Sequence, residues 1–189
     1  LFQRAFKRAG LPLTHTQGYN PRASVSIALP LSVGVASKCE LLEYELEGEE
    51  KPSHKEIVAR LNAALVEGVR VLHSYDNCAK IKNLAFLDAT VDLEYDAGIP
   101  AGAEEAIREL FSRQEILVEK KGKNGITEQD IAAMIKKMEI AAADDNILRI
   151  SARVCCQNPS LNPMQLYAAI EKYLPECRAD FVRCARQEV

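Results

Sequence analysis

Residues 138–155 read Met-Glu-Ile-Ala-Ala-Ala-Asp-Asp-Asn-Ile-Leu-Arg-Ile-Ser-Ala-Arg-Val-Cys. The run Asp144-Asp145-Asn146 is typical of a tight turn, because short polar side chains favour turn backbone conformations. The segments on either side, at 138–143 and 147–155, fit strands. We therefore predict an antiparallel hairpin here.

Further elements lie on both sides of this hairpin. Upstream, residues 89–95 alternate between apolar and polar as a strand does, and an apolar stripe within 100–111 predicts a helix. Downstream, Asn162 and Pro163 are typical of a helix start, and residues 179–186 are expected as the last strand. The predicted order is strand, helix, strand, strand, helix, strand.

One insertion interrupts this order before the hairpin. Residues 115–121 are expected as a strand, and Gly122-Lys123-Asn124-Gly125 as the turn that follows it. Thr127 and Asp130 resemble a capping box, and the apolar residues after them recur at helical spacing. This pattern predicts an additional helix with the stripe Ile131, Met134, Ile135 and Met138.

The first half of the chain repeats much of this order. Residues 1–9 form an amphipathic helix, and residues 24–29 and 41–47 alternate as strands. Ser53 begins a second helix as its N-cap, and residues 69–75 alternate as a third strand. The first half therefore has the same elements as the second, apart from an opening strand.

We expect an α+β protein of two ferredoxin-like halves with antiparallel sheets, at residues 1–80 and 84–189. The first half lacks its first strand at the N-terminus, and the second half carries one insertion. A strand upstream of Leu1 would complete the first half, and we expect that residues precede Leu1.

Composition excludes several classes of protein. The chain has 189 residues, 48% hydrophobic and 27% charged, which is ordinary for a globular protein and unlike a disordered chain. No apolar run approaches the length of a transmembrane helix, so no membrane association is expected. The formal net charge is −3, which argues against a global basic field. Six scattered cysteines favour reduced thiols and a cytoplasmic location.

Motifs for catalysis or metal binding are not found in the sequence. There is no Gly-rich phosphate loop, no His-Glu-x-x-His pair and no Cys-x-x-Cys pair. We therefore assign no catalytic residue, no metal and no cofactor, and an enzyme is the less favoured class.

Charge is distributed unevenly along the chain. Residues 1–39 contain basic residues and no acidic residue, whereas residues 40–50 contain six glutamates. Within the basic part, the loop from Leu11 to Arg22 is long and rich in hydrogen-bonding side chains, as functional loops often are. An ordinary ordered connection is an equal alternative. The functional alternative is an anion or nucleotide-phosphate site with these candidate residues: Arg4, Arg8, His15, Gln17, Gly18, Tyr19, Asn20 and Arg22.

Four short segments carry a family resemblance. They are Arg-Ala-Phe-Lys-Arg-Ala-Gly-Leu-Pro at 4–12, Gln-Gly-Tyr-Asn-Pro at 17–21, Ala-Leu-Pro-Leu-Ser-Val-Gly at 28–34 and Ser-Lys-Cys-Glu at 37–40. Together they resemble a radical-SAM-linked bacterial domain of unknown function. The resemblance implies a cobalamin-binding radical SAM protein as partner, and an upstream strand before Leu1. Relatives tend to carry a His-Pro-Lys-like stretch where this chain has Arg22-Ala23-Ser24, so the positive charge is displaced.

Two classes of function follow. The first is an accessory module that presents a substrate to the radical SAM partner, with RNA as the first candidate for that substrate. The alternative is a stand-alone enzyme that uses the loop at 11–22. An open basic groove across a sheet would favour the module, and a closed pocket at the loop would favour the enzyme.

Overall fold

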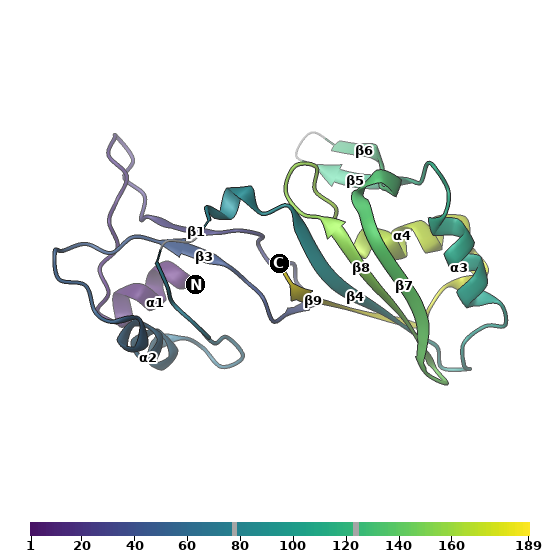
Figure 1. The fold of residues 1–189 in the computed structure, drawn as a ribbon, viewed down its shortest axis with the longest axis horizontal. Coiled ribbons are helices and arrows are strands. Elements are labelled where there is room, and N and C mark those ends of the chain that lie inside the picture. The colour runs from purple at the N-terminus through teal and green to yellow at the C-terminus, as the bar shows by residue number, and fades with distance from the viewer. Residues whose placement is uncertain (77–78, 123–124) are drawn as a thin grey trace. The chain divides into compact units, whose positions relative to one another are not determined.

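The computed structural model describes residues 1–76, 79–122 and 125–189, and Figure 1 shows the chain as a ribbon. The chain is a mixed α+β protein that forms two compact units. Unit 1 contains Leu1–Ala28 and Leu41–Asn83, and unit 2 contains Leu29–Glu40 and Leu84–Val189. The segment 29–40 therefore packs within unit 2. That residues 1–80 and 84–189 are separate domains stays a prediction.

Unit 2 is built on a five-stranded sheet. Its strands are β2 (Val35–Ser37), β4 (Phe86–Glu94), β7 (Ile135–Asp144), β8 (Ile147–Cys155) and β9 (Phe181–Glu188), in the order β2-β9-β4-β8-β7. Neighbouring strands are antiparallel, except that β2 runs parallel to β9. The predicted hairpin is confirmed as β7 and β8, with Ile140 opposite Ile150.

Two helices cover one face of this sheet. They are α3 (Ala103–Phe111) and α4 (Met164–Tyr173), both of which were expected from their apolar stripes. Alternate residues of β4 are buried, because successive strand side chains point to opposite faces. Val91 and Leu93 on β4 belong to the same buried cluster as Ile107 and Ile170 on the helices. This cluster is the core of unit 2.

The predicted additional helix after residue 127 is wrong. β5 (Leu117–Gly122) and β6 (Gly125–Asp130) form a separate antiparallel ladder, followed by the short 3-10 helix η2 (Ala132–Met134). The turn residues Lys123 and Asn124 lie outside the described residues.

A β-bulge explains why the sequence resembled a helix at this point. The register of β7 on β8 shifts between Ile135 and Lys137. Ile135 and Met138, three residues apart, therefore lie opposite Val154 and Ala152, two positions on the same face of β8. A bulged strand thus shows the apolar spacing of a helix.

Unit 1 packs two helices against a small sheet. The helices are α1 (Phe2–Arg8) and α2 (His54–Ala64), and the strands β1 (Val25–Ile27) and β3 (Leu42–Tyr44) are antiparallel. Phe6 is fully buried, and its ring centroid lies 5.0 Å from that of Tyr44. Ser53 caps α2 as predicted, because its Oγ accepts the Glu56 amide at 3.3 Å. A 3-10 helix, η1 (Ile81–Asn83), ends the unit.

The expected strand at 69–75 is not formed. A strand needs a neighbour for its backbone groups, and no described residue forms a ladder with this segment. At Val71 the side-chain amide of Asn62 takes the place of a neighbouring strand. Its oxygen accepts from the Val71 N–H at 2.8 Å, and its nitrogen donates to the Val71 carbonyl at 2.9 Å. The first half is therefore not shown to repeat the second.

The described cysteines are free thiols: Cys39, Cys155, Cys156, Cys177 and Cys184. Cys78 lies outside the described residues. Within the described part of the chain, no helix is both long enough and apolar enough to cross a membrane.

Asn62 offers a test of how the 69–75 segment is held. The substitution Asn62→Ala should lower the free energy of unfolding by about 1–3 kcal/mol, because it leaves two backbone groups of Val71 without their partner. Asn83→Ala, on the exposed surface of η1, is the control and should change stability by less than about 0.5 kcal/mol. Urea denaturation measures both, and equal stabilities of the two variants would contradict this account.

Candidate functional site

A loop of residues 13–24, referred to below as the 13–24 loop, projects from unit 1. Its base is held by backbone hydrogen bonds, from Ser24 N–H to the Thr14 carbonyl at 2.8 Å and from Thr14 N–H to the Glu45 carbonyl at 2.9 Å. Single bridges pair Leu13 with Leu46 and His15 with Ala23. The base is therefore an ordered extension of the unit 1 sheet.

The tip of this loop is fully exposed. Thr16 and Arg22 close it, because the Thr16 N–H donates to the Arg22 carbonyl at 2.8 Å and the Arg22 N–H donates to Thr16 Oγ1 at 2.9 Å. Gly18 has a φ of +142°, and the ring of Tyr19 has no measurable burial, at 102% exposure. In Figure 1 the tip points away from α1. The closed loop therefore presents five of the expected site residues on one small surface: Gln17, Gly18, Tyr19, Asn20 and Arg22.

The arginines of α1 do not join this surface. Arg8 donates from Nη2 to the carbonyl of Ala64 at 2.6 Å, so it caps the last turn of α2, where a cation is favoured by the helix dipole. Arg4 is exposed on the same helix. Of the expected site residues, Arg8 therefore has a structural role, and Arg4 lies apart from the loop tip.

Three of the six glutamates in residues 40–50 pair with groups other than these arginines. Glu47 lies 3.7 Å from the ring of His15, Glu43 lies 4.0 Å from Lys80, and Glu40 lies 2.9 Å from Arg186. Among ion pairs between described residues, none joins these glutamates to Arg4, Arg8 or Arg22. His15 is accordingly part of the loop base, beside an exposed carboxylate.

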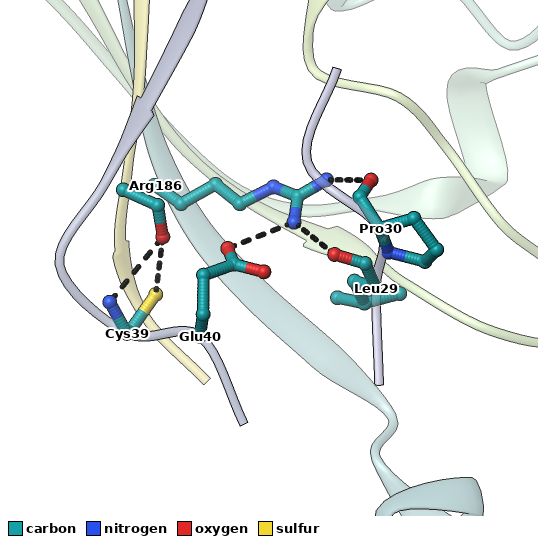
Figure 2. Close-up of polar contacts among 6 residues, drawn as sticks. Leu29, Pro30, Cys39, Glu40 and Arg186 are labelled. Atoms are coloured by element: carbon teal, nitrogen blue, oxygen red, sulfur yellow. Dashed lines mark hydrogen bonds and ion pairs between the residues drawn. The ribbon is translucent and has the colours of Figure 1, made fainter. Parts of the chain in front are cut away.

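A second candidate surface is the strap, defined here as residues 29–40. Arg186 on β9 is 9% exposed and holds both ends of the strap. Its Nη1 donates to the Leu29 carbonyl at 2.7 Å and to Oε1 of Glu40 at 2.9 Å, and its Nη2 donates to the Pro30 carbonyl at 3.4 Å. Figure 2 shows the guanidinium between Glu40 on one side and Leu29 and Pro30 on the other. Sequence reasoning missed this cluster, because its members lie up to 157 residues apart.

The strap is rigid at its ends and exposed in its middle. Leu29, Val35 and Cys39 pack against the core of unit 2, and burial raises the pKa of the Cys39 thiol, which keeps it protonated. Val33, between these anchors, is 105% exposed. No residue from 29 to 37 is charged, so the exposed middle of the strap at residues 31–34 is uncharged, with the exposed apolar side chains Leu31 and Val33. The exposed Lys38 lies beyond it, near the second anchor.

The sheet face opposite α3 and α4 is electrically balanced. Its arginines are paired across strands, Arg149 with Asp92 at 2.7 Å and Arg153 with Asp88 at 2.6 Å. Hydrogen bonding from Arg153 lowers the pKa of Asp88. The exposed rings of Phe86 and Phe181 lie at opposite ends of this face, because Phe181 pairs with Glu94. Among the described residues, this face therefore shows neither the basic groove nor the adjacent aromatic rings of a nucleic-acid-binding sheet.

Comparison with known families places most of the chain in a family that is known only by its conservation. Residues 1–163 match the model of a family described as "Uncharacterized protein conserved in bacteria (DUF2344)". No curated protein matches the chain. Both the 13–24 loop and the strap lie inside the matched region.

The Arg186 cluster makes a prediction about stability. Glu40→Gln should lower the free energy of unfolding by about 3 kcal/mol, because it leaves the buried guanidinium without its counter-charge. Arg186→Met should lower the free energy of unfolding by less than Glu40→Gln does. The side chain of Glu40 is one-third exposed, so water can hydrate its carboxylate once the arginine is gone.

The exposed pair of Arg60 with Glu56 on α2 is the matched control. Glu56→Gln should change stability by less than about 1 kcal/mol, as is typical of surface pairs. Thermal and urea unfolding of the three variants measure these differences. A Glu40→Gln variant as stable as Glu56→Gln would show that the buried pair does not hold the strap.

Proposed function

The chain belongs to the bacterial family of uncharacterised proteins that its first 163 residues match, and on this premise we propose that it is an accessory module that presents a substrate to a radical SAM partner protein. The partner is the cobalamin-binding radical SAM protein that the sequence resemblance implies, and the two act in the cytoplasm. In this proposal the chain binds and positions, and the partner carries out the chemistry.

The observation that carries the proposal is the exposed, anchored strap. An apolar side chain such as Val33 is stabilised when a partner removes it from water, by roughly 25 cal/mol per Å² of buried area. Because Arg186 already fixes both ends of the strap, binding costs little further ordering of the backbone. The uncharged middle of the strap, at residues 31–34, suits the apolar centre of a protein interface and offers phosphate groups no cation. The strap thus supports a protein as the docking partner.

The 13–24 loop supports the second part of the proposal, the binding of a substrate. Tyr19 offers a free ring face on which a base can stack, and Gln17 and Asn20 carry amides that can hydrogen-bond base edges. Arg22 supplies a cation beside them for a phosphate. Single-stranded RNA is therefore the first candidate for the substrate, with the loop as a binding element in place of a catalytic one.

The topology of unit 2 agrees with one part of the expected architecture. When β2 and the β5–β6 insertion are set aside, the remaining sheet is antiparallel, with the strand order β9-β4-β8-β7. Helix α3 lies between β4 and β7 in the chain, and α4 lies between β8 and β9. We infer that this unit is ferredoxin-like. A fold of this kind hosts many functions, so the functional proposal depends on the strap and the loop.

The strap makes the first functional prediction. Val33→Asp should weaken binding of the radical SAM protein about tenfold or more, because burying the new carboxylate in an apolar interface is costly. Isothermal titration of the purified partner into the chain measures the affinity. Val66→Asp, at an exposed valine of unit 1, is the control and should bind as the unsubstituted chain does. Unchanged binding by Val33→Asp would exclude the strap as the docking surface.

The loop makes the second prediction, which a salt titration of RNA binding tests. Arg22→Ala should make the log-log salt slope shallower by about 0.7, as expected when one contact to a single-strand phosphate is lost. Tyr19→Ala should weaken binding by about 1–3 kcal/mol without changing the slope, because stacking releases no counterion.

Tyr75→Ala removes another exposed ring of unit 1 and is the control for Tyr19. It should leave both the affinity and the slope unchanged. If the unsubstituted chain binds no RNA, or if Arg22→Ala keeps the full slope, RNA is excluded as the substrate of the loop.

A further inference from the structure

Three polar side chains of unit 1 are joined by hydrogen bonds, and the carboxylate of a fourth, Asp76, lies beside them. The hydroxyl of Tyr44 lies 2.5 Å from Ser74 Oγ, and Ser74 Oγ lies 2.9 Å from Nδ1 of His54. The other ring nitrogen of His54, Nε2, lies 3.3 Å from Oδ2 of Asp76. These side chains come from β3, from the first turn of α2 and from the segment after residue 69. No short sequence motif relates these four residues.

The protons in this chain have one consistent arrangement for a neutral imidazole. The Asp76 carboxylate only accepts, so it favours the form of His54 that carries its proton on Nε2. Nδ1 is then an acceptor, and Ser74 donates its hydroxyl proton to it. Tyr44 in turn donates to Ser74 Oγ. In this arrangement the hydroxyls of Tyr44 and Ser74 each have an acceptor, and the proton of Ser74 points at a base.

We propose that Ser74 is a nucleophile, with His54 as its general base and Asp76 as the group that orients the imidazole. A hydroxyl within hydrogen-bond reach of a base, which a third group orients, is the arrangement that activates a serine. Ser74 Oγ lies 2.9 Å from Nδ1 of His54, which is within the distance range for proton transfer between them.

The reaction is the hydrolysis of a carboxylic ester. Ser74 Oγ forms a bond to the acyl carbon while its proton passes to Nδ1 of His54. The bond from that carbon to the alcohol oxygen then breaks, and His54 returns the proton to the leaving alcohol. A water molecule attacks the acyl-serine by the reverse sequence and releases the acid. Once Ser74 Oγ has attacked, the single hydroxyl proton of Tyr44 can turn from Oγ toward the negative oxygen that develops on the former carbonyl of the ester.

The surroundings limit the substrate to a small, uncharged ester. The side chain of His54 is 43% exposed and that of Asp76 is 83% exposed, so the group reacts at the surface of the unit. The Asp76 carboxylate repels anionic substrates at this distance. Exposed Leu72 and Tyr75, beside Ser74 in the chain, offer apolar contact to a short acyl group. This activity is independent of the strap and of the 13–24 loop.

A fluorophosphonate probe tests the proposal on the full chain. Attack by Ser74 forms an oxygen–phosphorus bond and expels fluoride, and the serine proton goes to His54. Peptide mass spectrometry should find Ser74 labelled at least about tenfold faster than the exposed Ser26. His54→Asn should slow this labelling about 100-fold or more, because an amide can keep the hydrogen bond to Ser74 but cannot take its proton.

Two further measurements separate a nucleophile from a structural contact. Labelling of the unsubstituted chain should slow on acidification, because a doubly protonated imidazole has no lone pair for the Ser74 proton. Asp76→Asn, at a largely exposed position, should slow labelling about tenfold while circular dichroism stays unchanged. His73→Ala, at the exposed histidine next to Ser74, should leave labelling as it was.

The outcome that overturns the proposal is equally specific. Labelling of Ser74 at the rate of Ser26, or equal labelling of the unsubstituted chain and Asp76→Asn with no dependence on pH, assigns the four side chains a purely structural role. That role would be to join the first turn of α2 to the segment after residue 69.

Discussion

The guanidinium of Arg186 is the contact on which the most exposed apolar feature of the molecule depends. A cation that is nine-tenths buried needs a counter-charge and acceptors, and it finds them in Glu40 and in the carbonyls of Leu29 and Pro30. Because these partners lie at the two ends of the strap, one side chain fixes a segment that joins the sheet through β2. Val33 is thereby held in solvent on an ordered backbone.

The acidic run of residues 40–50 shows how one stretch of sequence serves both units. Glu40 completes the Arg186 cluster in unit 2, while Glu43 and Glu47 pair with Lys80 and His15 in unit 1. In sequence these glutamates look like the solvated face of one strand. In the structure these three glutamates instead pair with three different basic groups. The basic side chains of Arg4 and Arg22 face solvent, where they can contact a ligand.

The sequence predicted correctly those elements whose formation depends on residues close together in the chain. Alternation predicted β7 and β8, and apolar stripes and capping residues predicted α2, α3 and α4. Prediction from sequence failed where pairing with a neighbouring strand decides the structure. A bulge gives β7 the apolar spacing of a helix, and the 69–75 segment forms no ladder with any described residue. The loop residues from Gln17 to Arg22 could be named as one surface. Contacts such as Arg186 with Leu29, or Ser74 with His54, bring together distant residues that no short motif relates.

The central claim is that the strap docks a protein partner, and hydrogen exchange tests it most directly. Amide exchange of the full chain is followed by mass spectrometry with and without the purified cobalamin-binding radical SAM protein. The account predicts that exchange slows in peptides covering residues 31–37, where an interface would exclude water from the exposed strap. Binding of the partner with unchanged exchange across these residues, or no binding at all, would contradict it.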